Sequence, residues 1–170
     1  MWNHRGQQRP DFADEPGPGQ ESVWDYPRPP EIVADRRRVQ VLHDGGTIAD
    51  SVAAVRVRET ASPPTFYLPP EDIDVGRLVV VAGSSWCEFK GEARYFALAA
   101  DPAARVVAWS YPTPTAGFAS IRDWLSFYPG RLECRVDGAR VGPQGGGFYG
   151  GWVTAEIVGP CKGEPGTEGW

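Results

Sequence analysis

The chain has 170 residues, of which 41% are hydrophobic and 12% aromatic, and its formal net charge is −5. This length suffices for one domain with a hydrophobic core and is short for two. The interspersed acids and bases exclude the basic face of a duplex nucleic-acid binder, and no apolar run approaches the roughly 20 residues that span a bilayer. The N-terminus also lacks the apolar region of a secretion signal. We therefore expect a cytoplasmic monomer or homodimer whose partners include neither nucleic acid nor a membrane.

The chain contains few cysteine and histidine residues that could bind a metal or act as a catalytic nucleophile or base. Its three cysteines, Cys87, Cys134 and Cys161, lie far apart and lack CxxC spacing. Its two histidines, His4 and His43, stand outside any cluster. These counts argue against a structural or catalytic zinc and against a Ser–His or Cys–His nucleophile. We expect reduced thiols, no metal and no cofactor, so any catalysis would rest on carboxylates, Lys, Tyr, Arg or Cys.

The first part of the chain is rich in proline. Residues 1–21 combine proline, glycine and mixed charge with little to bury, which predicts a flexible tail. Residues 22–36 form an extended arm in our interpretation, because proline fixes φ, and Trp24 and Tyr26 are expected to dock on the domain. A polyproline ligand for the groove of another protein is the alternative. The basic run at residues 36–38 is interpreted as the solvated start of a strand, with a phosphate site as the alternative.

Short β-strands separated by turns dominate residues 37–142. Val55 and Val57 alternate with Arg56 and Arg58, which is typical of a strand with one buried face. Glycine and proline turns, and not crossover helices, separate the strands, so we expect antiparallel sheets. The other runs with strand character are residues 39–41, 65–68, 78–82, 86–89, 94–99, 106–111 and 132–136.

One helix is predicted near residues 117–128. Phe118, Ile121, Leu125 and Tyr128 recur there at helical spacing, and the Pro-Gly pair that follows would end the helix. The predicted fold class is therefore mainly β, with two antiparallel sheets and one main α-helix.

Residues 143–170 are rich in glycine yet contain several aromatic side chains, which predicts a packed C-terminal extension. Within it, residues 145–150 match the pattern GxGxxG. Dinucleotide binding by that motif needs a preceding strand and a following helix in a βαβ unit. The chain lacks such a unit, so we interpret the segment as a flexible loop whose aromatic residues fold back on the domain.

Polar and aromatic side chains gather in two segments, residues 58–69 and 85–95, beside proline-marked bends. From this convergence we predict an aromatic-lined pocket for a small polar or anionic ligand, oriented by Arg58, Glu59 and Lys90. The predicted ligand-binding residues are Arg58, Glu59, Tyr67, Cys87, Lys90, Tyr95, Trp109 and Tyr111.

Other interpretations of these residues stay open. Arg58 and Glu59 also suit a structural ion pair at a bend, and Cys87 suits a small buried hydrophobic residue. An enzyme would use Glu59 or Lys90 for acid–base chemistry and Cys87 as a nucleophile. A protein–protein interaction module would use the arm that carries Trp24 and the C-terminal extension as its contact surfaces.

These segments resemble a bacterial family catalogued as domain of unknown function 427 and sometimes labelled nucleotidyltransferase-like. The resemblance rests on residues 58–60, 63–64, 67, 87, 90–91, 95, 108–112 and 127–128. It implies a β-tent, in which two antiparallel sheets meet at an angle, and some β-tents bind small ligands in an aromatic cage between the sheets. Several relatives hold zinc with two CxxC pairs, which this chain lacks.

The nucleotidyltransferase label does not fit the order of the motifs in this chain. Such enzymes use a Gly-Ser loop for the triphosphate, followed by a D-x-D pair that holds metal. Here Asp72 and Asp74 precede Gly83-Ser84, and no D-x-D follows that pair. We therefore predict that the domain does not transfer nucleotides.

Overall fold

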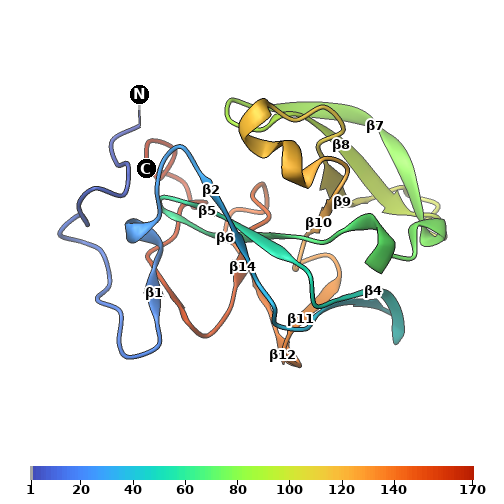
Figure 1. The fold of residues 1–170 in the computed structure, drawn as a ribbon, viewed down its shortest axis with the longest axis horizontal. Helices are drawn as coiled ribbons and strands as arrows, with labels where there is room; N and C mark the ends of the chain where they lie inside the picture. The colour runs from blue at the N-terminus through green and yellow to red at the C-terminus, as the bar shows by residue number, and fades with distance from the viewer. Residues whose placement is uncertain (1) are drawn as a thin grey trace.

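The computed structural model describes residues 2–170 as a mainly β chain with short 3₁₀ helices (Figure 1). The predicted fold class is confirmed in this respect. The strands are β1 (Glu21–Ser22), β2 (Glu31–Ala34), β3 (Val39–His43), β4 (Gly46–Ser51), β5 (Val55–Glu59), β6 (Ser62–Tyr67), β7 (Leu78–Cys87), β8 (Gly91–Leu98), β9 (Val106–Ser110), β10 (Leu125–Phe127), β11 (Glu133–Val136), β12 (Ala139–Arg140), β13 (Gly142–Pro143), β14 (Trp152–Val153) and β15 (Ile157–Val158). The 3₁₀ helices are η1 (Val23–Asp25), η2 (Pro70–Asp72), η3 (Val75–Arg77) and η4 (Ala116–Ile121).

None of the helices among residues 2–170 is long and apolar enough to cross a membrane.

Three antiparallel sheets contain most of the strands. Their strand orders are β2-β5-β6, β10-β9-β8-β7 and β12-β11-β3-β4. We call the first two the central sheet and the hairpin sheet, because β7 and β8 form a long hairpin, which lies along the upper edge of the molecule in Figure 1. Two further pairs, β13-β14 and β1-β15, attach the terminal segments.

The central and hairpin sheets are joined at one point. Leu68, directly after β6, and Leu125, at the start of β10, exchange both backbone hydrogen bonds, at 2.8 and 3.0 Å. Both side chains are buried in the main hydrophobic core, together with Phe66 and Phe127. The junction brings the two sheets together at one edge, and away from it they enclose the cavity described below.

The prediction of an α-helix near residues 117–128 is wrong. The structure has the 3₁₀ helix η4 there, followed by strand β10. Asp123 adopts a positive φ of 60° after the helical turn, and residues 125–127 then pair with β9 as β10. Phe118 and Ile121 are buried, as an amphipathic stripe requires. Sheet pairing therefore overrode the helical spacing of the apolar residues.

The two terminal segments lie against each other (Figure 1). Residues 2–21, expected to be a flexible tail, contact the end of the chain: the Phe12 ring stacks on Trp170 at 5.0 Å and meets Trp24 edge-on. Trp24 and Tyr26 of the predicted arm are buried. The division of the chain into tail, arm, domain and extension stays a prediction.

Trp152 provides a test of whether the C-terminal extension is part of the core. Its side chain is fully buried, stacks on Phe66 at 4.8 Å and donates a hydrogen bond from Nε1 to the carbonyl of Phe127 at 2.9 Å. We expect Trp152→Ala to lower the free energy of unfolding by about 3–5 kcal/mol, because it leaves a large cavity. Trp152→Phe keeps a ring on Phe66 and should cost less. Urea denaturation measures both, and a loss below about 1 kcal/mol for the alanine variant would contradict this view.

Candidate functional site

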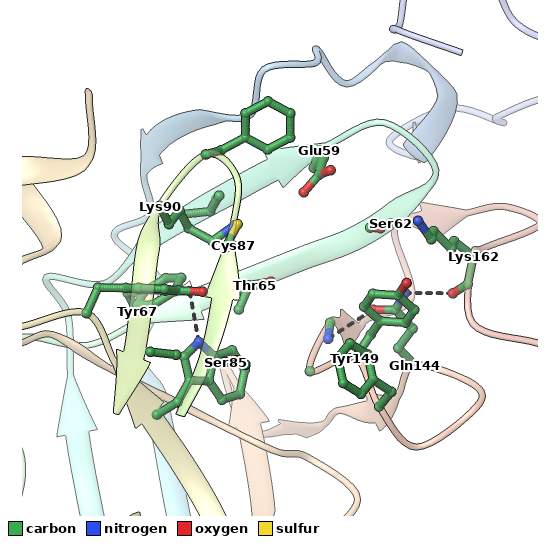
Figure 2. Close-up of a pocket in the computed structure, with 18 of the residues that line it drawn as sticks. Glu59, Ser62, Thr65, Tyr67, Ser85, Cys87, Lys90, Gln144, Tyr149 and Lys162 are labelled. Atoms are coloured by element: carbon green, nitrogen blue, oxygen red, sulfur yellow. Dashed lines mark hydrogen bonds between the residues drawn. The ribbon is translucent and has the colours of Figure 1, made fainter. Parts of the chain in front are cut away.

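A cavity of about 460 Å³, which we call the inter-sheet cavity, lies between the central sheet, the β7–β8 hairpin and the C-terminal segment (Figure 2). Its lining residues are Trp2, Val57, Glu59, Ser62, Pro63, Thr65, Tyr67, Ser85, Trp86, Cys87, Glu88, Phe89, Lys90, Ala93, Tyr95, Trp109, Tyr111, Tyr128, Gln144, Phe148, Tyr149, Gly150, Gly151 and Lys162. This volume is in the range of small-molecule sites.

The alternation of side chains along the strands decides which residues reach the cavity. Pro63, Thr65 and Tyr67 of β6 point into it, whereas Phe66 between them packs on Trp152 on the other face. On the opposite wall, Trp109 of β9 and Tyr111, directly after this strand, line the cavity, whereas Ser110 between them does not.

Seven of the eight predicted ligand-binding residues line the inter-sheet cavity: Glu59, Tyr67, Cys87, Lys90, Tyr95, Trp109 and Tyr111. Arg58 does not. It lies on the other face of β5, where it pairs with Glu31 at 2.7 Å and approaches Glu21 at 3.8 Å. Arg58 and Glu59 are neighbours in a strand, so their side chains point to opposite faces and cannot share a site. The prediction for Arg58 is therefore corrected to a structural ion pair.

A polar network joins the aromatic side chains of the wall. Trp109 donates from Nε1 to the hydroxyl oxygen of Tyr67 at 3.1 Å, and the hydroxyls of Ser85 and Tyr95 lie 2.6 Å apart. Burial raises the pKa of Tyr67 and of Tyr111 above the usual value, so both phenols stay protonated at neutral pH. The wall therefore presents neutral hydroxyl groups that can donate hydrogen bonds.

Lys90 lies in the turn between β7 and β8. This turn allows Cys87 and Lys90 to face the same cavity, although a continuous strand would have placed them on opposite faces. The side chain of Lys90 is buried, with Nζ 6.0 Å from the ring centre of Tyr111 and 5.7 Å from that of Phe118. Within residues 2–170 this ammonium group forms no hydrogen bond or ion pair.

Lys162 reaches the cavity from the opposite wall (Figure 2). It is buried, and its Nζ lies 3.9 Å from the ring centre of Trp2 and 5.3 Å from that of Tyr149. Burial lowers the pKa of Lys162, and the nearby guanidinium of Arg28 lowers it further. The ammonium group of Lys162 has no hydrogen-bond or ion-pair partner in the described chain. Lys90 and Lys162 are the only lysines among the 17 lysines and arginines of the sequence, and both line this cavity.

Glu59, a catalytic candidate together with Cys87 and Lys90, is already engaged. It accepts a hydrogen bond from Nε of Arg28 at 3.3 Å, and the Arg28 side chain is 2% exposed. Arg28 also donates to the carbonyl of Thr60 at 2.8 Å. The carboxylate thus compensates a buried guanidinium.

The D-x-D pair lies outside the cavity lining. Asp72 accepts a hydrogen bond from the hydroxyl of Ser51 at 2.6 Å, and Asp74 precedes η3. Among residues 2–170 no group of three or more His, Cys, Asp or Glu side chains could hold a metal ion.

The comparison with protein families agrees with the resemblance found in the sequence. Residues 31–142 match the family described as domain of unknown function (DUF427). The chain belongs to this family. A search of curated proteins finds no match. The DUF427 match spans β2 to β12 and therefore includes Lys90, whereas Trp2, Gln144, Tyr149 and Lys162 lie outside it.

Sequence reasoning missed the cavity residues of both terminal segments. Gln144 is buried and fixes this part of the chain: its amide donates to the carbonyl of Lys162 at 2.6 Å and accepts from the backbone of Gly151 at 3.1 Å. The glycines of this segment are the sequence feature that could have indicated these contacts. At Gly150 a side chain is excluded, because a Cβ atom there would overlap the Trp109 ring. The glycine-rich segment of the DUF427 chain lines the cavity through Phe148, Tyr149 and Gly150, but residues 145–148 are exposed, and Phe148 is 70% exposed and does not fold back on the domain as Tyr149 does.

The three cysteines should react with iodoacetamide in a fixed order. Cys87 lines the cavity and should be alkylated first. Burial raises the pKa of Cys161 to about 11, so its reactive thiolate is scarce at pH 8. Cys134 is fully buried, and its pKa is raised further. Peptide mass spectrometry follows the order, and urea should make all three react alike. Native labelling of Cys134 as fast as Cys87 would contradict the structure.

Proposed function

We propose that this domain binds a small anionic molecule with a planar apolar part in the inter-sheet cavity. The observation that carries the proposal is the pair of lysines, Lys90 and Lys162, whose side chains are largely buried and whose ammonium groups face one cavity without a direct hydrogen-bond or ion-pair partner in the described chain. A charge in a partly enclosed site loses solvation, and without a counter-charge this costs free energy. An anionic ligand supplies that counter-charge, so its binding relieves the cost.

No carboxylate of the lining forms a direct ion pair with these lysines in the described chain. Glu59 is paired with Arg28, and Glu88 is exposed at the tip of the hairpin, so both act on Lys162 only through longer-range attraction. Nζ of Lys90 lies over the rings of Tyr111 and Phe118, and aromatic rings attract a cation weakly compared with an anion in the same position. The electrostatic balance of the cavity therefore favours an anion beside Lys90.

The rest of the wall suits a planar apolar group. Tyr67, Trp109 and Tyr111 supply flat apolar surface, and the hydroxyl groups of the two tyrosines can orient polar substituents. Trp86 and Phe148 line the same cavity and are 74% and 70% exposed, which makes its mouth apolar. An apolar mouth favours the entry of an aromatic ligand over that of a bare inorganic ion.

Lys90→Met tests the proposal, because methionine keeps the apolar stem and removes the charge. The probes are benzoate, phenyl phosphate and uridine monophosphate, each paired with its neutral analogue benzamide, phenol or uridine. A probe at 100 times its dissociation constant should stabilise the native protein by about 2.7 kcal/mol, a rise in melting temperature of roughly 5–10 °C. The shift should vanish for the neutral analogue and in Lys90→Met.

Arg105→Met is the matched control. Arg105 is an exposed cation paired with Asp101 far from the cavity lining, so its loss should leave the shift unchanged. If no anionic probe stabilises the protein, or if anionic and neutral probes act equally in both variants, the proposal is wrong.

A further inference from the structure

One side chain of the N-terminal segment is inserted into the inter-sheet cavity. Trp2 belongs to the lining, and its Nε1 donates a hydrogen bond to Oε1 of Glu88 at 2.6 Å. The guanidinium of Arg28 lies 4.3 Å from the centre of the Trp2 ring, and Nζ of Lys162 lies 3.9 Å from it. The indole is therefore held by two cations over its ring and one acceptor at its N–H.

The groups that hold Trp2 are positioned by other parts of the chain. Arg28 is fixed by Glu59 and by the carbonyl of Thr60. Lys162 is fixed through its backbone, which donates to the carbonyl of Ala61 at 2.7 Å and accepts from Gln144. Both anchors are buried; Arg28 also donates to the carbonyl of His4 in the N-terminal segment at 3.0 Å, but its bonds to Glu59 and Thr60 do not involve that segment. Arg28, Lys162 and Glu88 thus form a subsite, which we call the indole subsite, whose cationic part remains in place when Trp2 leaves.

We propose that Trp2 occupies the indole subsite in cis, and that an external ligand with an electron-rich planar ring and a ring N–H displaces it. Cations over a ring are attracted by its electron-rich face, so two of them select an electron-rich heteroaromatic ring over an electron-poor one. The carboxylate of Glu88 selects a ring N–H, because it can only accept a hydrogen bond. The inference rests on the proposed function, since the anionic group of the same ligand is assigned to Lys90.

The position of Trp2 also explains how the cavity is closed. Trp2 connects the tip of the β7–β8 hairpin, through Glu88, with the opposite wall, through Arg28 and Lys162. A ligand that enters the indole subsite competes with a tethered side chain, and its apparent affinity is reduced by the fraction of molecules in which Trp2 is bound. The N-terminal segment therefore acts as an intramolecular competitor.

The chain offers an internal reporter for this inference, because its two lysines lie on opposite sides of the cavity. Trace acetylation with acetic anhydride, followed by peptide mass spectrometry, gives the reactivity of Lys162 relative to Lys90. In Trp2→Ala we expect this ratio to rise at least about threefold, because the ring that covers Nζ of Lys162 is gone. Trp2→Phe keeps a ring but has no N–H for Glu88 and should give an intermediate ratio. Circular dichroism confirms that both variants are folded.

Binding provides the second measurement. Calorimetry with indole-3-acetate should give an affinity at least about fivefold higher for Trp2→Ala than for the native chain, since the competitor is removed. The probe 1-methylindole-3-acetate lacks the N–H and should bind Trp2→Ala more weakly than indole-3-acetate does. Indole-3-acetate should also protect Lys162 of Trp2→Ala from acetylation.

The two proposals fail differently. An unchanged acetylation ratio and unchanged affinity in Trp2→Ala would overturn the inference about the indole subsite, even where Lys90→Met still abolishes the binding of anionic probes. Binding of indole-3-acetate that gains affinity in Trp2→Ala but is unaffected by Lys90→Met would instead overturn the anion site and keep the indole subsite. Equal binding of the methylated and unmethylated probes would remove the role assigned to Glu88.

Discussion

The reciprocal hydrogen bonds between Leu68 and Leu125 are the contact on which the arrangement of the site depends. They join the central sheet to the hairpin sheet along one buried edge, and neither backbone group could be left unpaired there without a large cost. Because the sheets are fixed at this edge and separate beyond it, their facing sides cannot pack on each other everywhere. Tyr67 of β6 and Trp109 of β9 line the space that results, and parts of the terminal segments cover it.

The arginines and the lysines of this chain differ in how they are paired. The arginines around the central sheet are paired: Arg37 with Asp35 and Glu156, and Arg58 with Glu31. The two lysines are buried and have no such partner in the described chain. Guanidinium groups suit fixed, multidentate pairing, whereas an ammonium group is a compact charge that accepts varied geometries. That contrast favours the lysines as the groups that meet a ligand, with a cost in stability that the free protein bears.

The sequence predicted the strands and most of one wall of the cavity, because both follow from local patterns. Tyr67, Cys87 and Trp109 could be assigned to one aromatic recess from their place beside proline-marked bends. Arg58 was misassigned because strand alternation was not applied to its own pair with Glu59. The helix near residues 117–128 failed because its apolar spacing also satisfies a 3₁₀ turn followed by a strand, and only the pairing of β10 with β9 decides between them. Trp2, Gln144 and Lys162 reach the site through contacts between distant parts of the chain, which no local pattern encodes.

The boundary of the DUF427 match divides the cavity into two parts with different chemistry. Lys90 and the tyrosines of the wall, Tyr67, Tyr95 and Tyr111, lie within residues 31–142. Trp2, Gln144 and Lys162 lie outside the match. In the proposed function, the shared part supplies the positive charge and the flat apolar surface for an anion with a planar group. The cations proposed to contact the ring, Arg28 and Lys162, lie outside the match, whereas Glu88, proposed to accept its N–H, lies inside it. Because Arg28 and Lys162 are anchored on the turn at Thr60–Ala61 of the shared part, we expect changes in either terminal segment to alter which ring is accepted and to leave the proposed anion site beside Lys90 in place.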